Sequence, residues 1–247
     1  MSGAVAFVSR CRVELAGRSV VVTGASAGIG RALTLRLAGR GARVVAAARS
    51  SAALDALARE AGPAVHAVPV DVTRDDSVAA LGASARRACG KIDVVVNNAG
   101  VGWVEPFASS SVAHWEETLA TNLLGALRVT RAFLPLLREG GGLVVNVGSA
   151  AASGWPYVAL YAASKAALRA ASLAIDRELR ASGVRVLCVD IGPTTGTGFG
   201  SRSDAAHVAE AVQAWTALDV GPARELATAE ISAQRIVDAI ETALGDV

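Results

Sequence analysis

The chain has 247 residues, 52% of them hydrophobic, so it can bury a substantial core within one domain. Its formal net charge is +2, and its dispersed basic residues form no block longer than Arg86-Arg87, which argues against nucleic-acid binding. No apolar run reaches the length of a membrane span, so we expect no membrane insertion.

The N-terminal residues show no convincing targeting signal. Residues 1–8 are too short for the apolar core of a signal peptide, and no basic residue precedes them. Three cysteines, Cys11, Cys89 and Cys188, lie far apart without metal-ligand spacing, which indicates reduced thiols and no metal site. We therefore expect a cytoplasmic protein with one domain over residues 1–247, in which residues 1–16 are an N-terminal extension.

The first predicted element is a buried strand at Ser19–Thr23, which a glycine-rich turn follows directly. Gly24, Gly28 and Gly30 let the backbone turn tightly, and the apolar periodicity after them predicts a helix. Main-chain N–H groups and the helix dipole favour a pyrophosphate at such a helix N-terminus. The spacing differs from the Gly-x-Gly-x-x-Gly dinucleotide pattern, and a glycine turn without a ligand is the alternative.

Five further apolar runs predict buried strands, and helical patterns fill the gaps between them. These runs lie near residues 43–47, 64–69, 92–96, 143–147 and 184–189. Continuously apolar strands that alternate with helices indicate a parallel sheet with helices on both faces. Because such crossovers are right-handed, we expect the strand order 3-2-1-4-5-6 in a doubly wound α/β domain.

Tyr161 and Lys165 are one turn apart in a segment predicted to be helical, so they share a face. About one free tyrosine in a thousand is ionised at neutral pH, because its pKa is about 10. A neighbouring ammonium lowers that pKa and makes the phenol a better base. Lys165 is one of only two lysines, the other being Lys91. The same spacing also occurs in unrelated helices, where the tyrosine is buried and the lysine is solvated.

With these motifs in one chain, the sequence resembles the short-chain dehydrogenase/reductase family from about Leu15 to about Leu244. Several ordered landmarks are far more specific than any one of them. The resemblance implies a Rossmann-like, dinucleotide-binding α/β domain and an enzyme that interconverts a ketone or aldehyde and an alcohol by hydride transfer. The landmarks occur in the family's order: Thr23-Gly24-x-x-x-Gly28-Ile29-Gly30, Asp71-Val72, Asn97-Asn98-Ala99-Gly100, Asn122, Ser149, Tyr161 and Lys165.

The end of the second strand bears on the choice of cofactor. Relatives that bind NAD commonly carry an acidic residue there, whereas this chain has Ala48 and then Arg49. A guanidinium pairs with a 2′-phosphate through charge-assisted bonds of roughly 1.5–3 kcal/mol each. We expect NADP(H), with NAD(H) as the alternative, because Ala27 stands where many NADP-binding relatives have a second basic residue. The resemblance implies the following cofactor-binding residues: Gly24, Ser26, Gly28, Ile29, Gly30, Arg49, Asp71, Val72, Asn98, Ala99, Gly100, Tyr161, Lys165, Gly192, Pro193 and Thr195.

The resemblance also implies catalytic roles for Ser149, Tyr161, Lys165 and Asn122. Ser149 is expected to hold the substrate oxygen while Tyr161 exchanges a proton with it as general acid or base. Lys165 is expected to lower the pKa of Tyr161 and to bond the nicotinamide ribose. Asn122 is expected to support a water that connects Lys165 to solvent. The alternative interpretation makes Tyr157 the exposed phenol.

The glycine-rich stretch Ile191–Ser203 precedes a helical pattern at about Asp204–Leu218. Ligands of doubly wound sheets bind beyond the carboxyl ends of the strands, so we expect residues 191–220 to form a substrate-binding loop and helix. A mobile surface loop is the alternative. The threonine that contacts the nicotinamide amide is expected to be Thr195, with Thr197 as the alternative.

Two features depart from the family pattern. Ile191-Gly192-Pro193 stands where relatives usually have Pro-Gly, and no segment for a seventh strand follows the helical pattern at Ser232–Leu244. A sheet edge or tetramer contact built on that strand is therefore in doubt. The long helices around Asn122 and Tyr161 are expected to form a homodimer or homotetramer.

Aromatic residues make up only 4% of the chain, and several fall in segments expected around the pocket mouth. This placement favours a lipophilic carbonyl or alcohol substrate, although the same rings could simply anchor loops. Two other functions stay open: an NAD-dependent alcohol dehydrogenase and a non-catalytic dinucleotide-sensing or scaffold protein. The aromatic residues concerned are Trp103, Trp155, Tyr157, Phe199 and Trp215.

Overall fold

The structure, a computed structural model, describes residues 14–223 and 226–245, so Cys11 and most of the predicted extension 1–16 lie outside the described residues. Its strands are β1 (Ser19–Thr23), β2 (Arg43–Ala48), β3 (Val65–Pro69), β4 (Val94–Asn97), β5 (Gly142–Ser149) and β6 (Val184–Ile191). They form one parallel sheet in the order β3-β2-β1-β4-β5-β6, which confirms the predicted order.

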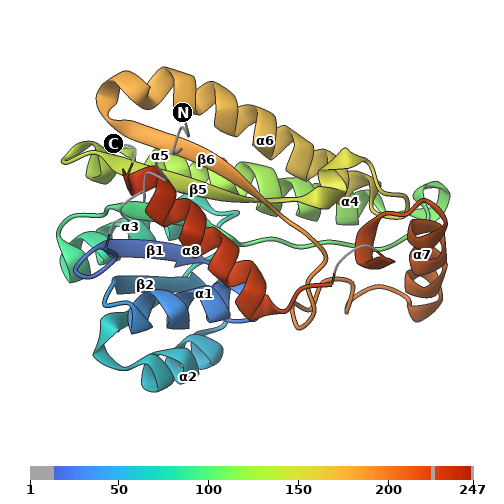
Figure 1. Cartoon of the computed structure of the whole chain (residues 1–247), viewed down its shortest axis with the longest axis horizontal. Coiled ribbons are helices and arrows are strands. Elements are labelled where there is room, and N and C mark those ends of the chain that lie inside the picture. Colours follow the sequence, from blue (N-terminus) through green and yellow to red (C-terminus); the bar gives the residue numbers. More distant parts are fainter. Residues whose placement is uncertain (1–13, 224–225, 246–247) are drawn as a thin grey trace, which may run out of the picture.

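Helices connect consecutive strands and cover both faces of the sheet (Figure 1). A π-helical turn at Ala120–Gly125 joins two of them into one continuous helix. The predicted helical segments 204–218 and 232–244 correspond to the last two helices. The helices are α1 (Gly28–Gly39), α2 (Ser51–Ala61), α3 (Asp75–Cys89), α4 (Val112–Leu119), α5 (Ala126–Arg138), α6 (Ala159–Leu179), α7 (Ala205–Ala217) and α8 (Ala229–Gly245).

The core is divided by the sheet into two layers, because successive side chains of a strand point to opposite faces. Val20 and Val22 of β1 pack in the same cluster as buried residues of α1, α2 and α8, and α8 crosses in front of the sheet in Figure 1. Val21 packs in the opposite cluster with residues of α3 and α5, including Phe133. This two-sided burial explains why inner strands such as β1, β2 and β4 are almost continuously apolar, whereas the edge strands β3 and β6 carry exposed or polar residues; it confirms the α/β, doubly wound fold class.

The segments predicted to bind ligands follow the carboxyl ends of the strands. The glycine turn follows β1, Arg49 follows β2, Asp71 lies beyond β3, Asn98 follows β4 and Ser149 ends β5. Because all the strands are parallel, these positions share one edge of the sheet. The connection from β6 to α7 reaches the same end of the molecule, at the right of Figure 1.

Among the described residues, β6 pairs with β5 alone and no seventh strand lies beyond it. The two strands are in register from Gly142 opposite Val184 to Ser149 opposite Ile191. Within the same residues, every helix is too short or too polar to cross a membrane.

Candidate active site

A cavity of ≈550 Å³ lies at the carboxyl edge of the sheet, within the usual size of small-molecule sites. Three predicted site residues, Gly30, Asn122 and Thr195, are absent from its wall. The predicted residues that do line it come from every strand end: Gly24, Ser26, Gly28, Ile29, Arg49, Asp71, Val72, Asn98, Ala99, Gly100, Ser149, Tyr161, Lys165, Gly192 and Pro193.

The glycine turn is shaped by close backbone packing. Gly24 and Gly28 have φ values of +66° and +51°, and a Cβ on either would come within 3.0 Å of neighbouring backbone. A Cβ on Gly30 would overlap the carbonyl oxygen of Gly24, so Gly30 lets α1 approach the turn instead of lining the cavity. Glycine is therefore required at all three positions.

The N-terminus of α1 fits an anionic group. Its N-cap residue, Ala27, offers no side-chain hydrogen bond, and the next two residues, Gly28 and Ile29, line the cavity. The first N–H groups of a helix have no partner within the helix, so here they can donate to a ligand. This arrangement fits the pyrophosphate of a dinucleotide.

Asn98 fixes the same turn from the neighbouring strand end. Its Nδ2 donates to the carbonyl oxygens of Thr23 at 3.0 Å and Gly24 at 3.2 Å. In addition, the Thr23 hydroxyl accepts from the backbone N–H groups of Asn98 and Ala99. Asn98 thus lines the cavity and also positions the glycine turn, a role that its sequence motif did not indicate.

Arg49 is exposed at the cavity wall, directly after β2. No carboxylate of the described residues forms an ion pair with it, although its charge reaches the carboxylates of Asp71 and Glu117. Its donors are therefore available to a phosphate at this end of the cavity.

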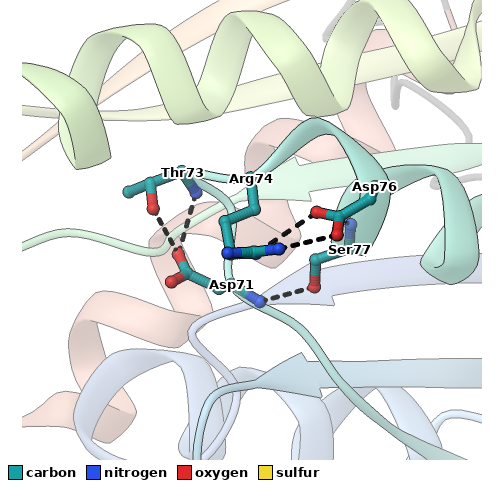
Figure 2. Close-up of polar contacts among 5 residues, drawn as sticks. All are labelled: Asp71, Thr73, Arg74, Asp76 and Ser77. Atoms are coloured by element: carbon teal, nitrogen blue, oxygen red, sulfur yellow. Dashed lines mark hydrogen bonds and ion pairs between the residues drawn. The ribbon is translucent and has the colours of Figure 1, made fainter.

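Asp71 joins the turn after β3 to the first turn of α3 (Figure 2). Its Oδ1 accepts from the N–H and the hydroxyl of Thr73, at 2.9 and 2.7 Å, and its own N–H donates to Ser77. The hydrogen bond from the Thr73 hydroxyl lowers the pKa of Asp71. Asp71 can therefore cap this turn and still bind the cofactor, because Oδ1 closes the turn while Oδ2 accepts no hydrogen bond from the described residues.

Tyr161 lies in the first turn of α6, and its side chain meets Ser149 at the end of β5. Burial raises the pKa of the Tyr161 hydroxyl, and the hydrogen bond with the Ser149 hydroxyl opposes that rise. Sequence reasoning predicted that Lys165 would lower this pKa. In the structure the net shift is upward, because removing the ring from water disfavours the phenolate.

Lys165 is buried one turn further along α6, with Nζ 5.7 Å from the centroid of the Tyr161 ring. Nζ donates to the carbonyl oxygen of Val147 at 2.7 Å, which points the ammonium at β5 and not at the phenol hydroxyl. Burial lowers the pKa of Lys165 to about 8, and the neighbouring Cys188 and Asp190 oppose that shift.

Asn122 is buried behind the cavity, within the π-helical turn between α4 and α5. Its Oδ1 accepts from the N–H of Val101 at 2.8 Å, and its Nδ2 donates to the carbonyl of Val101 at 2.9 Å and to the Ser164 hydroxyl. The side chain thus ties the segment after β4 to α6. Such π-turns are frequent at functional sites, where they reposition a single residue.

The connection after β6 forms part of the cavity wall. Thr194 and Thr197 line the wall, whereas Thr195 donates from its N–H and its hydroxyl to the carbonyl of Ala227, outside the wall. The backbone of Thr197 packs against Gly28. Of the two threonines considered from the sequence, the structure brings Thr197 to the glycine turn, whereas Thr195 is hydrogen-bonded to Ala227 in the segment before α8.

Three of the five expected aromatic residues, Trp155, Phe199 and Trp215, line the cavity. The Phe199 ring lies 4.8 Å from that of Tyr161, centroid to centroid. Trp103 and Tyr157 lie outside this wall and border a much smaller hollow.

Sequence reasoning missed several residues of the wall. Most are apolar or glycine residues that any strand end could carry, so no sequence signal marks them. Arg202 is different, because it is the only charged residue of Ile191–Ser203. The missed residues are Ala27, Ala48, Ser50, Val70, Val101, Gly102, Thr121, Val147, Gly148, Ala151, Val158, Pro222 and Leu226, whereas Ile191, Thr194, Gly198 and Arg202 were expected only as part of the segment 191–220 and not individually.

Comparisons with known proteins agree with this arrangement. A protein-family model described as short chain dehydrogenase matches residues 18–207. The NADP-dependent 3-hydroxy acid dehydrogenase YdfG of Salmonella typhi is 38% identical over 186 residues, which cover 74% of this chain and 75% of that protein.

Two solved structures are similar over most of the chain. The closed form of serine dehydrogenase complexed with NADP+ has a TM-score of 0.76 and 31% identity, covering 90% of this chain and 87% of that one. A short-chain dehydrogenase/reductase from Burkholderia phymatum in complex with NAD has a TM-score of 0.79 and 27% identity, covering 93% of this chain and 88% of that one.

Proposed function

The chain belongs to the short-chain dehydrogenase family, and on that premise we propose that it is an NADP(H)-dependent oxidoreductase that interconverts a ketone or aldehyde and an alcohol. One observation carries the proposal: Ser149, Tyr161 and Lys165 line the same cavity as the uncapped N-terminus of α1. A proton-handling group and a dinucleotide cradle therefore share one space, as hydride transfer to a carbonyl requires.

In the reductive direction, NADPH held in this cavity would supply the hydride to the carbonyl carbon. The Tyr161 hydroxyl gives its proton to the carbonyl oxygen, so the C=O group becomes a CH–OH group. The Ser149 hydroxyl orients that oxygen, since it already hydrogen-bonds Tyr161. The raised pKa of Tyr161 keeps the phenol protonated at neutral pH, which suits a general acid.

Lys165 and Asn122 support this proton transfer. The Lys165 ammonium is held by Val147 close to the Tyr161 ring, where it can bond a ribose hydroxyl and favour the phenolate left after transfer. Asn122 fastens α6 to the backbone at Val101, and we propose that the same region holds the water through which Lys165 exchanges protons with solvent.

The choice of NADP(H) rests on Arg49. Its guanidinium reaches the cavity without an ion-pair partner among the described residues, and no carboxylate follows β2 to repel a 2′-phosphate. The NADP-dependent relative supports this choice, and the neighbour solved with NAD makes NAD(H) the alternative.

The substrate is proposed to be lipophilic. Trp155, Phe199 and Trp215 give the cavity an apolar side next to Tyr161, and residues 191–220 are proposed to close over the substrate. Two relatives are named for 3-hydroxy acids and for serine, so a hydroxy acid or its oxo acid is a second candidate.

The remaining expectations stay proposals. Leu124 and Leu173 are exposed on the long helices expected to form a homodimer or homotetramer, which supports that assembly. We also propose that residues 1–247 form one domain and that the protein is cytoplasmic.

The test of the chemistry is NADPH oxidation with a panel of aliphatic, aromatic and 3-oxo carbonyl compounds. Tyr161→Phe removes the proton donor, so kcat is expected to fall roughly 10²- to 10⁴-fold while NADPH still binds. Tyr157→Phe is the matched control, because Tyr157 is the other tyrosine and lies outside the cavity wall. Turnover that survives in Tyr161→Phe and is lost in Tyr157→Phe would contradict the proposal.

The choice of cofactor is tested by comparing NADPH and NADH binding. Arg49→Ala is expected to weaken NADPH binding about tenfold to a hundredfold and to leave NADH binding unchanged, because only NADPH carries the 2′-phosphate. Arg59→Ala, an exposed arginine of the neighbouring α2, is the control. Equal affinities of the wild-type protein for NADPH and NADH would contradict the proposal that Arg49 selects NADP(H).

A further inference from the structure

Arg202 is a cation of the cavity wall that the proposed chemistry leaves without a role. Among the described residues, the wall holds four charged side chains, Arg49, Asp71, Lys165 and Arg202. Arg49 and Asp71 follow β2 and β3, nearer the other edge of the sheet than Ser149, although the Arg49 charge also reaches Glu117, and Lys165 is bonded to Val147. Arg202 follows Phe199 by three residues, and Phe199 contacts Tyr161.

Two groups, Glu117 and the Trp103 ring, hold the Arg202 guanidinium in place. A terminal nitrogen donates to Glu117 Oε1 at 2.8 Å, and the guanidinium carbon lies 4.2 Å from the centroid of the Trp103 ring. Trp103 is itself fixed, because its Nε1 donates to Glu117 Oε2 at 3.1 Å and its ring stacks on His114 at 3.6 Å. The cation is thus positioned before any ligand arrives.

The backbone around Arg202 is fastened to the segment after β4. The Ser203 hydroxyl accepts from the N–H of Val104 at 2.8 Å. At Gly102 a side chain would overlap the Phe199 ring, so glycine there allows the two segments to meet. Phe199 and Arg202 therefore both line the cavity from this segment, with the Phe199 ring beside Tyr161 and the Arg202 guanidinium on the Trp103 ring.

The Arg202 side chain keeps donors for a second anion. A guanidinium has five N–H donors in a rigid fork, and the pairing with Glu117 uses one of the terminal nitrogens. Its side chain is 49% exposed, so solvent can be replaced by a ligand. Glu117 lies outside the cavity wall, so a ligand in the cavity meets the cation first.

We propose that Arg202 is a specificity-determining residue that binds a carboxylate of the substrate, so that the site prefers oxo acids and hydroxy acids to neutral carbonyl compounds. This inference rests on the proposed function. A planar guanidinium held on a tryptophan matches a carboxylate with two parallel hydrogen bonds. Phe199 then contacts the chain between the carboxylate and the reacting carbon.

The experiment compares 3-oxo acids with their methyl esters as substrates for NADPH oxidation. The wild-type protein is expected to have a KM at least tenfold lower for the acid. Arg202→Met is expected to raise the KM for the acid tenfold to a hundredfold, with kcat and the ester KM changed less than about twofold. Arg202→Lys keeps the charge without the fork and is expected to recover part of the preference.

Arg86→Met is the matched control, because it removes an arginine from another arginine–glutamate pair, with Glu139, on an exposed surface. Thermal unfolding and NADPH titration of each variant establish that it is folded. Equal losses for acid and ester, together with weaker NADPH binding, would assign Arg202 to the cofactor and overturn the inference.

Failure of the two proposals can be distinguished. Esters reduced as well as acids by the wild-type protein would overturn the role of Arg202 and leave the oxidoreductase function intact. Binding of NADPH without reduction of any acid or ester would overturn the proposed function, and the role of Arg202 with it.

Discussion

Lys165 illustrates how burial changes the behaviour of a single residue. Its ammonium is removed from water on α6, where it donates to the Val147 carbonyl and forms no ion pair with a carboxylate of the described residues, so burial lowers its pKa from 10.5 to about 8. A buried amine whose pKa lies near neutrality can exchange protons under working conditions. The same burial destabilises the folded protein while the amine is charged.

We predict a pH-dependent stability that belongs to Lys165. Between pH 8 and 10.5 the unfolded chain keeps a proton that the folded chain has lost, so the free energy of unfolding rises with pH across this window. The shift corresponds to about 3 kcal/mol at roughly 1.4 kcal/mol per unit. Lys165→Met is expected to abolish the rise.

The measurement is urea unfolding at intervals from pH 7 to 10.5. Lys91→Met is the control, because Lys91 is the other lysine of the chain and its side chain is 43% exposed. The wild-type protein and the control are expected to show the rise. Parallel profiles for the wild type and Lys165→Met would show that Lys165 does not carry this penalty.

The elements around the cavity depend on positions where no side chain fits. The turn before α1 is held by Asn98 and closes on Gly30, so the helix begins close to β1. Helix α3 contains Gly82 with open space around it, where glycine only weakens the helix. Replacing Gly30 of α1 and replacing Gly82 of α3 are therefore expected to have opposite effects on the stability of the protein.

We predict that Gly30→Ala destabilises the protein by about 1–3 kcal/mol, because its Cβ would overlap the backbone of Gly24. The displaced turn is also expected to weaken NADPH binding. Gly82→Ala is expected to stabilise the protein by roughly 0.5–1 kcal/mol and to leave binding unchanged. Chemical denaturation and NADPH titration measure both, and similar effects of the two substitutions would contradict this reading of α1.

At the scale of the whole molecule, the first and last helices are joined by a buried carboxylate. Glu241 of α8 is 5% exposed and pairs with Arg40 at the end of α1, 201 residues earlier. Its second oxygen, Oε2, accepts no hydrogen bond within the described residues. Arg40 is thus the ion-pair partner of this buried carboxylate, at the contact between α1 and α8.

We predict that Arg40→Ala lowers the free energy of unfolding by about 3 kcal/mol, because it leaves Glu241 buried and unpaired. Adding Glu241→Gln removes that charge and is expected to recover most of the loss. Urea unfolding of the single and double variants provides the measurement. A double variant as unstable as Arg40→Ala would show that lost packing, and not the charge, is responsible.

The sequence alone determined much of the fold and the centre of the site. Apolar runs predicted all six strands because the inner strands of a parallel sheet are buried on both faces and the edge strands keep apolar positions, and helical spacing brought Tyr161 and Lys165 to one face. These signals are local, since each depends on the period of a strand or a helix. The order of the landmarks then indicated the family, and a family model matches residues 18–207.

The tertiary structure decided what depends on contacts between distant residues. Arg202 enters the cavity wall because it meets Glu117, 85 residues away, and Asn98 acts on a turn 74 residues earlier. Tyr161 has a raised pKa because folding buries it, which no local pattern reports. Thr197 reaches the glycine turn, whereas Thr195 is hydrogen-bonded to Ala227. Periodicity shows which face of an element is buried, whereas only packing determines which side chains meet there.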